Sequence, residues 1–507
     1  MTTEMVAAHT SAEAGAAGQE CNNAQILALS TSLFADRVFL YTQFLEGLGE
    51  SAAVTVWANS ARLPRHRDLW RSSRADVEGF PQVRPFREFP YNLLRRLNEF
   101  VWDYRYRPPS RLSMWKHVRR RSVPGGIRAL RGPARVLALM RAERALERHL
   151  NKLLLSYPRS PEAVERLVSL SPDVVLATGP FQFEQPAIVA AARNLGIPVL
   201  ALVPSWDNIS TKHRMIFNYD GFMVWSEQTK SDLHRFYPYS RNVPVYIVGA
   251  AQFDVFFQKR FHDTREAFCA DHGLQPELPI IVYAVGSPNF LNEHHGAMDM
   301  AVRVVRGELG DAQMIVRPHP VHDNGQMAAQ FKEFYPRVVL QRTAEVDLAR
   351  NARSQDERQI REWVNTFRHA DVVINLSSTV AIDAAIFDRP VVNLDYDPEP
   401  GQPNQGLVKD VNHTWTHFKP IAESGAMWLV NNPDEMVAAV RTYLAHPELH
   451  REERRWVAEH VCGDLDGRSG TRMAEAILDF HQQRSQAHLH QLSRNAEPRV
   501  KKRGATN

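Results

Sequence analysis

Cysteine is scarce in this chain of 507 residues, and the three that occur are too widely spaced for a disulfide framework or a metal-binding motif. No run of apolar residues approaches the roughly 18 to 20 that are needed to cross a bilayer. Residues 1–24 are small and polar and lack the apolar stretch of a signal peptide. We therefore expect a disordered leader over 1–24 and a cytoplasmic protein.

Familiar catalytic signatures are also missing. The chain has no Walker A loop, no Gly-x-Gly-x-x-Gly turn, no Gly-x-Ser-x-Gly elbow and no His-Glu-x-x-His motif. These absences argue against a P-loop ATPase, a typical dinucleotide enzyme, an α/β-hydrolase and a zinc protease. A lone acidic pair, Asp395 and Asp397, follows a predicted strand, but surface carboxylates are common there. We therefore assign no metal site and expect no cofactor.

Strand and helix patterns alternate along most of the chain, and a chain of this length needs more than one core. The strands are nearly continuous apolar runs, which is typical of parallel strands covered on both faces. The pattern pauses at 271–279, a proline-rich linker. We therefore predict an α/β protein of two Rossmann-like, doubly wound domains that face a central cleft. The predicted parts are an amino-terminal domain over 25–270 with a basic insertion over about 60–133, a carboxyl-terminal domain over 280–483, and a disordered tail over 484–507.

Positive charge is concentrated in one region. Residues 62–148 hold 22 Lys and Arg against 8 Asp and Glu, although the whole chain carries a net charge of only +4. Aromatic residues and prolines are interleaved with this charge. An anionic membrane surface, an anionic acceptor, nucleic acid and a plain solvated face all remain open as explanations. Because no nucleic-acid motif accompanies the charge, we expect no nucleic acid, and we favour an anionic acceptor or peripheral binding to the inner face of the plasma membrane.

Polar groups follow three strands of the second predicted domain, and in such sheets ligands bind outside the carboxyl ends of the strands. These residues are Gly286, Ser287, Arg317, His319, Ser377, Ser378 and Thr379. Arg317 can bind a phosphate through two parallel hydrogen bonds, and His319 can donate to a phosphoryl oxygen or steady a leaving group. Ser377–Thr379 precedes a helix, whose free N–H groups and dipole favour a diphosphate. Asp383 follows, within reach of a sugar or ribose hydroxyl.

This pattern predicts a donor site for a nucleotide diphosphate. The alternatives are that Ser377–Thr379 merely caps a helix and that Arg317-Pro-His-Pro320 is an exposed turn.

Hydrogen-bonding side chains also surround a tryptophan after the strand at 198–203: Ser205, Trp206, Asp207 and Asn208. Together with Gly179, which follows the preceding strand, they suit the binding of a sugar or a similar polar acceptor. The alternative is an Asx-type turn with Trp206 packed in the core. A carboxylate of this domain would deprotonate the acceptor hydroxyl. Asp207 and Asp36 are the candidates for this base, and His319 completes the predicted catalytic set.

The order of several short motifs resembles the GT-B glycosyltransferases: Thr178-Gly179, Ser205-Trp-Asp-Asn208, Trp225-Ser-Glu227, Val248-Gly-Ala-Ala-Gln-Phe-Asp254, Arg317-Pro-His-Pro320 and Ser377-Ser378. The last two are similar to elements of the CDP-glycerol glycerophosphotransferases, and the layout is similar to that of UDP-N-acetylglucosamine 2-epimerases. The resemblance covers roughly residues 170–400. It implies that the carboxyl-terminal domain binds the nucleotide donor, with its diphosphate on Arg317, His319, Ser377 and Ser378.

We therefore expect a glycosyltransferase that moves a sugar from a nucleotide-sugar donor to a lipid-linked or polysaccharide acceptor of the cell envelope. It needs no metal if Arg317, His319 and the helix terminus neutralise the leaving diphosphate. A nucleotide-sugar 2-epimerase, a CDP-glycerol-type glycerophosphotransferase and a non-catalytic nucleotide-sugar binding protein are the alternatives.

Overall fold

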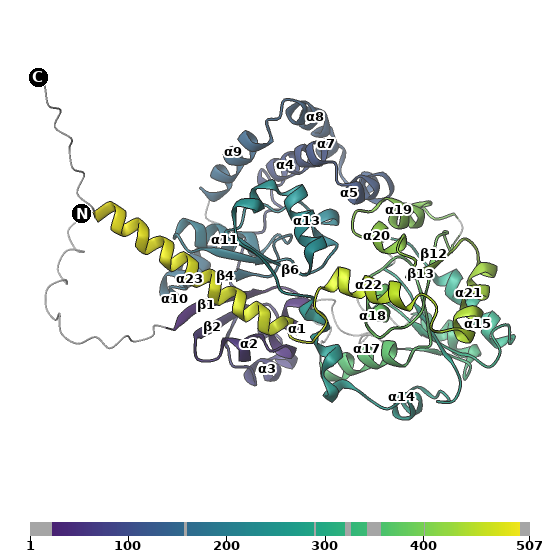
Figure 1. Cartoon of the computed structure of the whole chain (residues 1–507). Helices are drawn as coiled ribbons and strands as arrows, with labels where there is room; N and C mark the ends of the chain where they lie inside the picture. Colours follow the sequence, from purple (N-terminus) through teal and green to yellow (C-terminus); the bar gives the residue numbers. More distant parts are fainter. Residues whose placement is uncertain are drawn as a thin grey trace, which may run out of the picture.

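The computed structural model describes residues 23–156, 160–287, 290–319, 326–341, 356–399 and 401–496, and these residues form two α/β domains (Figure 1). Residues 1–22 of the predicted leader lie outside the described residues, and the first strand begins at Ala24. In the described part of the chain, no helix is long and apolar enough to span a membrane.

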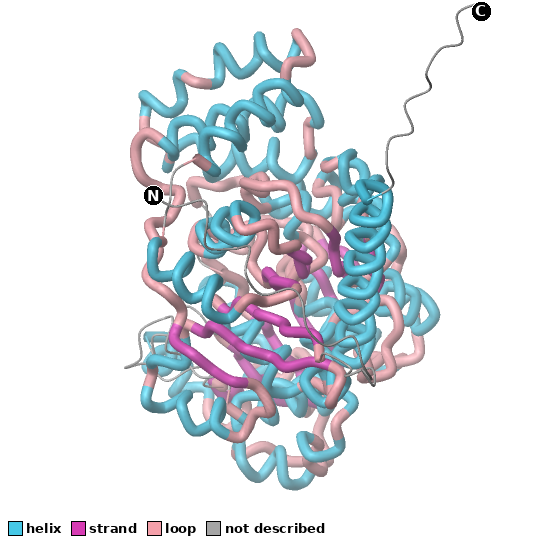
Figure 2. Tube along the Cα trace, turned by 90° about the vertical axis from the view of Figure 1, so that its left-hand side faces the viewer, coloured by secondary structure: helices cyan, strands magenta, loops and turns pink. Residues whose placement is uncertain are grey.

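Both domains are built on a parallel sheet whose strand order reverses once. The amino-terminal sheet has the order β3-β2-β1-β4-β5-β6-β7, and the carboxyl-terminal sheet has the order β10-β9-β8-β11-β12-β13. Figure 2 shows helices on either side of the amino-terminal strands. The order reverses between β1 and β4 and between β8 and β11, the positions where ligands bind in such sheets. The strands are β1 (Ala24–Ser30), β2 (Ala52–Ala58), β3 (Asp76–Gly79), β4 (Val174–Ala177), β5 (Val199–Leu202), β6 (Gly221–Val224), β7 (Val245–Ile247), β8 (Ile280–Ala284), β9 (Gln313–Arg317), β10 (Val338–Leu340), β11 (Val372–Asn375), β12 (Val391–Leu394) and β13 (Met427–Val430).

Helices cover both sheets and form a separate subdomain. Those around the first sheet are α1 (Leu33–Tyr41), α2 (Phe44–Leu48), α3 (Pro64–Arg71), α10 (Pro161–Leu170), α11 (Gln185–Asn194), α12 (Asn208–Thr211) and α13 (Glu227–Phe236). The subdomain holds α4 (Tyr91–Tyr106), α5 (Pro109–Met114), a π-helical segment (Trp115–Arg119), α6 (Arg120–Ser122), α7 (Gly125–Ala129), α8 (Arg131–Leu139) and α9 (Glu143–Leu155). The remaining helices are α14 (Arg265–His272), α15 (His294–Val305), α16 (Gln326–Phe331), α17 (Glu357–His369), α18 (Val380–Ile386), α19 (Leu407–Thr414), α20 (Lys419–Ala422), α21 (Pro433–Ala445), α22 (Arg451–Cys462) and α23 (Ser469–Ala496).

The insertion begins later and ends later than the predicted 60–133. Its first part, through β3, belongs to the sheet, because β3 pairs with β2 from Asp76 to Gly79. The helical insertion is α4–α9, and both views place it at one end of the molecule (Figures 1 and 2). The prediction missed β3 because an edge strand needs no continuous apolar run, and this one reads Asp-Val-Glu-Gly.

The joint between the domains also lies earlier than the predicted 271–279. Phe268, Cys269 and Leu274 are buried in the core of the carboxyl-terminal domain, and so is Phe253, which follows β7. The proline-rich segment is therefore a turn between α14 and β8 within one domain.

The chain returns to the amino-terminal domain at its end, which corrects the predicted boundary at 483 and the predicted tail. Helix α23 runs to Ala496, and Met473, Ile477 and Phe480 are buried in the amino-terminal core with Leu48 of α2. Figure 1 shows α23 lying across that domain. The apolar residues of its first half recur at helical spacing, so burial of this face extends the helix beyond the predicted end. Residues 497–507 lie outside the described residues.

Candidate functional site

Residues that follow strands of one domain contact residues that follow strands of the other. Trp206, which follows β5, donates from Nε1 to Oγ1 of Thr379, which follows β11, at 3.5 Å. Trp206 is buried, and its ring meets the ring of His417 edge-on at 4.7 Å. The predicted acceptor loop and the predicted donor turn are therefore neighbours across the domain junction, with Trp206 packed between them.

The turn at Ser377 is held by asparagines from three elements. Ser377 has a φ of +46°, in the left-handed region that residues other than glycine seldom adopt. Its N–H donates to Oδ1 of Asn393 at 2.8 Å, and its hydroxyl donates to Oδ1 of Asn412 at 2.7 Å. The hydroxyl of Ser378 donates to Oδ1 of Asn375 at 2.6 Å. These bonds fix a strained turn at the entrance to α18.

Two backbone donors remain at this turn. Among the hydrogen bonds of the described residues, none uses the backbone N–H of Ser378 or Thr379. Both groups lie at the N-terminus of α18, where unsatisfied N–H groups attract negative charge. The hydroxyls of Ser377 and Ser378 already donate to asparagines, whereas that of Thr379 accepts from Trp206. The turn can therefore offer a phosphate two backbone donors and the hydroxyl of Thr379.

Arg317 lies buried at the end of β9. Its Nη1 donates to Oε1 of Gln341, and its guanidinium carbon lies 5.8 Å from the centre of the Phe367 ring. Gln341 donates in turn to Oγ1 of Thr366 at 2.7 Å. These contacts hold the guanidinium at the carboxyl edge of the sheet, and His319 lies half-buried two residues further on.

Asp383 is buried where α1 of one domain meets α17 and α18 of the other. Its Oδ1 accepts a hydrogen bond from Nε1 of Trp363 at 2.9 Å, and the guanidinium of Arg37 lies 4.3 Å from the centre of that tryptophan ring. Burial raises the pKa of Asp383 to about 7, against the opposing charges of Arg317 and Arg37. Asp383, which we predicted to bind a sugar or ribose hydroxyl, is thus also part of the contact between the domains.

The glycine turn after β8 is shaped by a buried carboxyl group. The N–H of Gly286 donates to Oε2 of Glu293, and a Cβ at Gly286 would lie 2.6 Å from that oxygen. A larger residue at this position would therefore have to displace the Glu293 carboxyl group. Burial raises the pKa of Glu293 to about 8, so the group binds its proton through the neutral range. Ser287 follows directly and is half-buried.

The carboxylate of Asp207 is fixed by its own loop. It accepts hydrogen bonds from Oγ of Ser205 at 2.5 Å, Nδ2 of Asn208 at 2.9 Å and Oγ1 of Thr211 at 2.9 Å. Burial alone would raise the pKa of Asp207, but the nearby charges and these hydroxyl donors lower it below its ordinary value. Asp207 is therefore ionised at neutral pH and held in one orientation.

His417 brings an imidazole of the carboxyl-terminal domain to the same loop. Its Nδ1 lies 3.3 Å from Oγ of Ser210. Burial lowers the pKa of His417 to about 4, although the charge of Asp207 acts in the opposite direction. The imidazole is therefore neutral at neutral pH.

The remaining predicted residues, Asp36 and Gly179, lie in the interior of the amino-terminal domain. Asp36 is buried and accepts a hydrogen bond from Ser30 at the end of β1; burial raises its pKa to about 6. The N–H of Gly179 donates to Oε1 of Gln185 at 2.7 Å, and a Cβ at Gly179 would lie 2.5 Å from Oε1 of Gln182. Gly179 therefore allows two glutamines to pack at the end of β4.

Arg37, Glu293, Trp363 and His417 were not predicted from the sequence. Only Arg37 carries a signal, because it interrupts an apolar stretch of a predicted helix. The other three reach the site through packing between distant segments.

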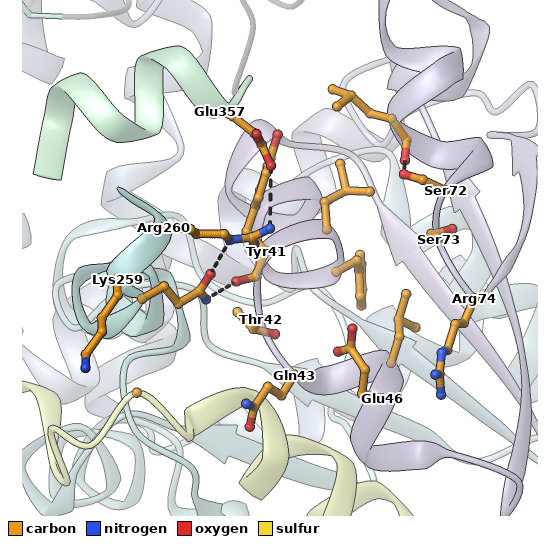
Figure 3. A pocket seen from close by; sticks show the side chains of 16 residues that line it. Tyr41, Thr42, Gln43, Glu46, Ser72, Ser73, Arg74, Lys259, Arg260 and Glu357 are labelled. Atoms are coloured by element: carbon orange, nitrogen blue, oxygen red, sulfur yellow. Dashed lines mark hydrogen bonds and ion pairs between the residues drawn. The ribbon is translucent and has the colours of Figure 1, made fainter. Parts of the chain in front are cut away.

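A cavity of about 570 Å³ lies beside this junction and contains none of the predicted site residues. Figure 3 shows its lining, which comes from the end of α1, from α2 and α3, and from the segment around Arg260. Arg260 contacts Oε1 of Gln258 at 3.0 Å and Glu357 at 3.5 Å, and Gln258 donates to the carbonyl oxygen of Tyr41 at 2.6 Å. The charges of Arg260 and Glu357 are therefore paired within the lining of this cavity.

The acidic pair after β12 is engaged in hydrogen bonds. Asp395 accepts from Asn412 at 2.9 Å, and Asp397 accepts from the N–H of Gly406 at 2.7 Å. Within the described ranges, no group of three or more His, Cys, Asp or Glu side chains is placed to hold a metal ion.

The profile of the family described as CDP-Glycerol:Poly(glycerophosphate) glycerophosphotransferase matches residues 204–479. A comparison with curated proteins gives no match.

Several solved structures are similar to the chain in fold. The UDP-GlcNAc 2-epimerase of Neisseria meningitidis, bound to UDP-GlcNAc, is 12% identical over 90% of this chain and 100% of that chain, with a TM-score of 0.51. MnaA of S. aureus, in a co-structure with UDP, is 10% identical over 90% of this chain and 96% of that chain, with a TM-score of 0.51. The UDP-GlcNAc 2-epimerase of Methanocaldococcus jannaschii is 13% identical over 90% and 99%, with a TM-score of 0.50. At such low identity the likeness shows the fold alone, and the predicted GT-B-like fold is confirmed.

Proposed function

The chain belongs to the CDP-Glycerol:Poly(glycerophosphate) glycerophosphotransferase family, and from that premise we propose that it transfers a nucleotide-activated group to a hydroxyl of a cell-envelope acceptor. The predicted resemblance to this family is thereby confirmed. One observation carries the proposal. A single family profile over 204–479 includes both the Asp207 loop and the Ser377 turn, and these two segments meet through Trp206 and Thr379.

Family membership favours phosphoryl transfer. The acceptor oxygen would attack the donor phosphorus that bears the glycerol, the bond between the two phosphates would break, and a nucleoside monophosphate would leave. Glycosyl transfer, expected from the sequence, is the second candidate, because the fold is shared with proteins whose structures hold UDP-GlcNAc or UDP. In that reaction the acceptor oxygen would attack the sugar carbon, and a nucleoside diphosphate would leave.

The donor diphosphate is assigned to the carboxyl-terminal wall of the junction. Arg317 and His319 would face its negative charge, and the turn would add the N–H groups of Ser378 and Thr379 and the hydroxyl of Thr379. Such donors stabilise a leaving phosphate without reorganising, because the packing around them already fixes their positions. Gly286 and Ser287 would let the donor approach the backbone, and Asp383 would lie near a hydroxyl of the bound nucleotide. On this assignment the transfer requires no metal.

Asp207 is the preferred base for the acceptor hydroxyl. Its carboxylate is ionised and held by three side chains, so it can accept a proton without first losing one. Asp36 is the weaker candidate, because it is buried and bonded to Ser30.

Product analysis tests the reaction class. The purified protein is mixed with CDP-glycerol or with UDP-GlcNAc and with lipid-linked acceptor, and the released nucleotide is separated by chromatography. We expect acceptor-dependent release of CMP from CDP-glycerol. Acceptor-dependent release of UDP would select glycosyl transfer, and formation of an epimer without acceptor would select the epimerase alternative. If the nucleotides raise the Tm but no product forms, the protein is a nucleotide-binding protein and the proposed transfer is overturned.

We also propose that the insertion binds an anionic membrane surface through the apolar tip between α8 and α9. Leu139 and Met140 are 76% and 70% exposed there. Four exposed arginines lie in these helices or in the turn between them: Arg135, Arg141, Arg144 and Arg148. Apolar side chains flanked by arginine suit the boundary between headgroups and acyl chains, and attraction to anionic lipid fades within a Debye length.

Vesicle flotation tests this surface. The wild-type chain should float with anionic vesicles at low salt, and less with neutral vesicles or at high salt. The double change Leu139→Ser and Met140→Ser should abolish flotation, because each side chain contributes about 1.5 kcal/mol or more when buried. Leu195→Ser, an exposed leucine at the end of α11, is the matched control. Equal flotation of both variants would show that the tip is not part of the membrane contact.

A further inference from the structure

Part of the positive charge of the insertion is buried around one carboxylate. Glu99 of α4 is buried, and its oxygens lie 2.6 Å from Arg111, 3.0 Å from Arg96, 3.2 Å from Arg95 and 3.7 Å from Arg119. The cluster of these five side chains is called here the Glu99 network. It joins α4, α5 and the π-helical segment in the interior of the insertion.

The Glu99 network contains more positive than negative charge. The second carboxylate near it is Asp103, which contacts Arg111 at 2.5 Å. Four guanidinium groups therefore share two carboxylates. The ring of His213 lies 3.1 Å from Glu99, but burial lowers its pKa to about 4, so the ring adds no charge at neutral pH. Among the described residues, these four arginines and two carboxylates carry a net charge of +2.

The pKa values of two arginines are consistent with this excess. Burial, and then the charges of neighbouring arginines, lower the pKa of Arg119 to about 10. Burial likewise lowers the pKa of Arg95 to about 10, only partly opposed by Glu99. Arg111 is different, because Asp103 and Glu99 outweigh its burial and raise its pKa. The two carboxylates therefore neutralise Arg111 and leave the other arginines short of negative charge, which is costly in a buried position.

The network is bonded to the loop that carries the proposed base. Arg111 donates to the carbonyl oxygen of Lys212, and Arg119 donates to the carbonyl oxygen of Thr211 at 2.8 Å. Lys212 is exposed, and its charge acts on Asp207. The side chains of Arg96 and Arg119 are 20% and 16% exposed, so solvent reaches the network at its edge.

We propose that Arg96, Arg119 and Lys212 form a subsite for a phosphate group of the acceptor, beside Asp207. Guanidinium groups bind phosphate oxygens through paired, charge-assisted hydrogen bonds, and a phosphate of one or two negative charges matches the excess of the network. The subsite rests on the proposed function in one respect, since the transfer reaction makes the phosphate part of an acceptor. It gives the buried half of the basic region a role different from that of the apolar tip.

A purely structural network and an anion subsite predict opposite effects for one substitution. If Arg96 only stabilises the fold, Arg96→Gln lowers the Tm of the ligand-free protein. If Arg96 adds to an excess of positive charge around Glu99, Arg96→Gln leaves the ligand-free Tm unchanged or raises it, while phosphate binding weakens. Arg119→Gln provides a second variant that should weaken phosphate binding; because it also loses the bond to Thr211, its ligand-free Tm is not part of the comparison. Arg84→Gln, an exposed arginine before the insertion, is the matched control.

The experiment measures the Tm of the full chain with increasing inorganic phosphate, with glycerol 3-phosphate and with phosphatidylglycerol vesicles. We expect both soluble phosphates to raise the Tm of the wild type and of Arg84→Gln. Arg96→Gln and Arg119→Gln should weaken the apparent phosphate affinity roughly ten- to hundredfold, the loss expected for a hydrogen bond to a charged group.

Three results would overturn the subsite: no stabilisation of the wild type by either soluble phosphate, unchanged affinity in both variants, or stabilisation by vesicles alone. The measurement uses neither donor nor turnover. A failed transfer assay would therefore leave this result standing, and a failed phosphate titration would leave the transfer reaction untouched.

Discussion

The two walls of the domain junction are supported in different ways. On the carboxyl-terminal wall, the Ser377 turn is held by Asn375, Asn393 and Asn412 of the same domain. On the amino-terminal wall, the Asp207 loop is bonded to Arg119 of the insertion. It also meets His417 of the other domain through the hydroxyl of Ser210.

This difference predicts that donor binding depends on the carboxyl-terminal wall alone, whereas the amino-terminal wall depends on contact between the domains. A wall made within one domain can bind donor whether or not the domains are closed. A wall that includes parts of the insertion and of the other domain is complete only when these parts are in contact. We therefore expect changes on the first wall to act on donor affinity or local stability, and changes on the second to act on turnover.

The largest expected effect is on the amino-terminal wall. Asp207→Asn keeps the shape of the loop but removes the proposed base, and loss of a general base typically costs a factor of about 10² to 10⁴ in rate. Donor affinity, measured by calorimetry, should not change. Asp311→Asn, an exposed carboxylate in a turn before β9, serves as the control. Turnover of Asp207→Asn within a factor of two of the wild type would assign the base elsewhere.

On the carboxyl-terminal wall, Asn393→Ala should be the most damaging change to stability. Asn393 is buried, accepts from the N–H of Ser377 and donates to Oδ1 of Asn412 at 3.0 Å. Its loss leaves buried partners unsatisfied, which costs about 1 to 3 kcal/mol per group. Urea unfolding should show this loss, together with weaker nucleotide binding. Asn431→Ala, on the surface near α21, provides the control; equal stability of the two variants would contradict a self-supporting turn.

Donor affinity alone should change in Arg317→Ala. The guanidinium is already held by Gln341 and Phe367, so the substitution removes a positioned charge. The expected loss in nucleotide affinity is about 1.5 to 3 kcal/mol, as for a hydrogen bond to a charged group. Calorimetry with CDP and UDP measures it, with Arg337→Ala as a control at a partly exposed arginine near β10. Unchanged nucleotide affinity in both variants would show that the donor site does not lie at the end of β9.

Asp383 links the two walls and should make their contact sensitive to pH. Burial raises its pKa from an ordinary value of 3.8 to about 7. Because the folded pKa lies above the unfolded one, the stabilising effect is complete below about pH 4 and is lost as the pH rises through 7. Between pH 5.5 and pH 8 the wild type should therefore lose about 2 kcal/mol of stability relative to Asp383→Asn. Urea unfolding of both proteins at the two pH values tests this, and parallel curves would show that the carboxyl group does not titrate there.

The contrast between the walls also explains what the sequence could predict. The residues proposed for the donor wall could be picked out from the sequence because they lie at the ends of continuous buried strands: Arg317 is the last residue of β9, and Ser377 follows β11. The edge strand β3 escaped prediction because it reads Asp-Val-Glu-Gly and lacks the continuous apolar pattern. The edge strand β13, Met-Trp-Leu-Val, is apolar throughout but only four residues long, and it was also missed. The partners of the acceptor wall could not be predicted, because Arg119 and His417 reach it from segments far away in sequence.

The same limit applies to the boundaries of the parts. The proline-rich segment at 271–279 has the composition of a linker, but tertiary packing places Leu274 in a core. The end of the chain is polar enough to suggest a tail from residue 484, yet α23 continues to Ala496 and Arg484 donates to the carbonyl oxygen of Asp220 at 2.8 Å. Composition indicates the local conformation that a segment prefers. Whether the segment is a linker, a tail or part of a core depends on the surface against which it packs.

The smallest expected effect is that of chelation. If the carboxyl-terminal wall alone neutralises the leaving phosphate, through Arg317 and the donors of the Ser377 turn, EDTA should leave turnover unchanged. The assay compares the rate in EDTA with the rate after Mg²⁺ or Mn²⁺ is restored. Loss of activity on chelation and recovery with either ion would contradict a self-sufficient wall. It would also make Asp395 and Asp397 the first residues to test as ligands, since both lie after β12 and already bind polar neighbours. Unchanged turnover would mean that the fixed charges and N–H groups of one domain replace a bound ion.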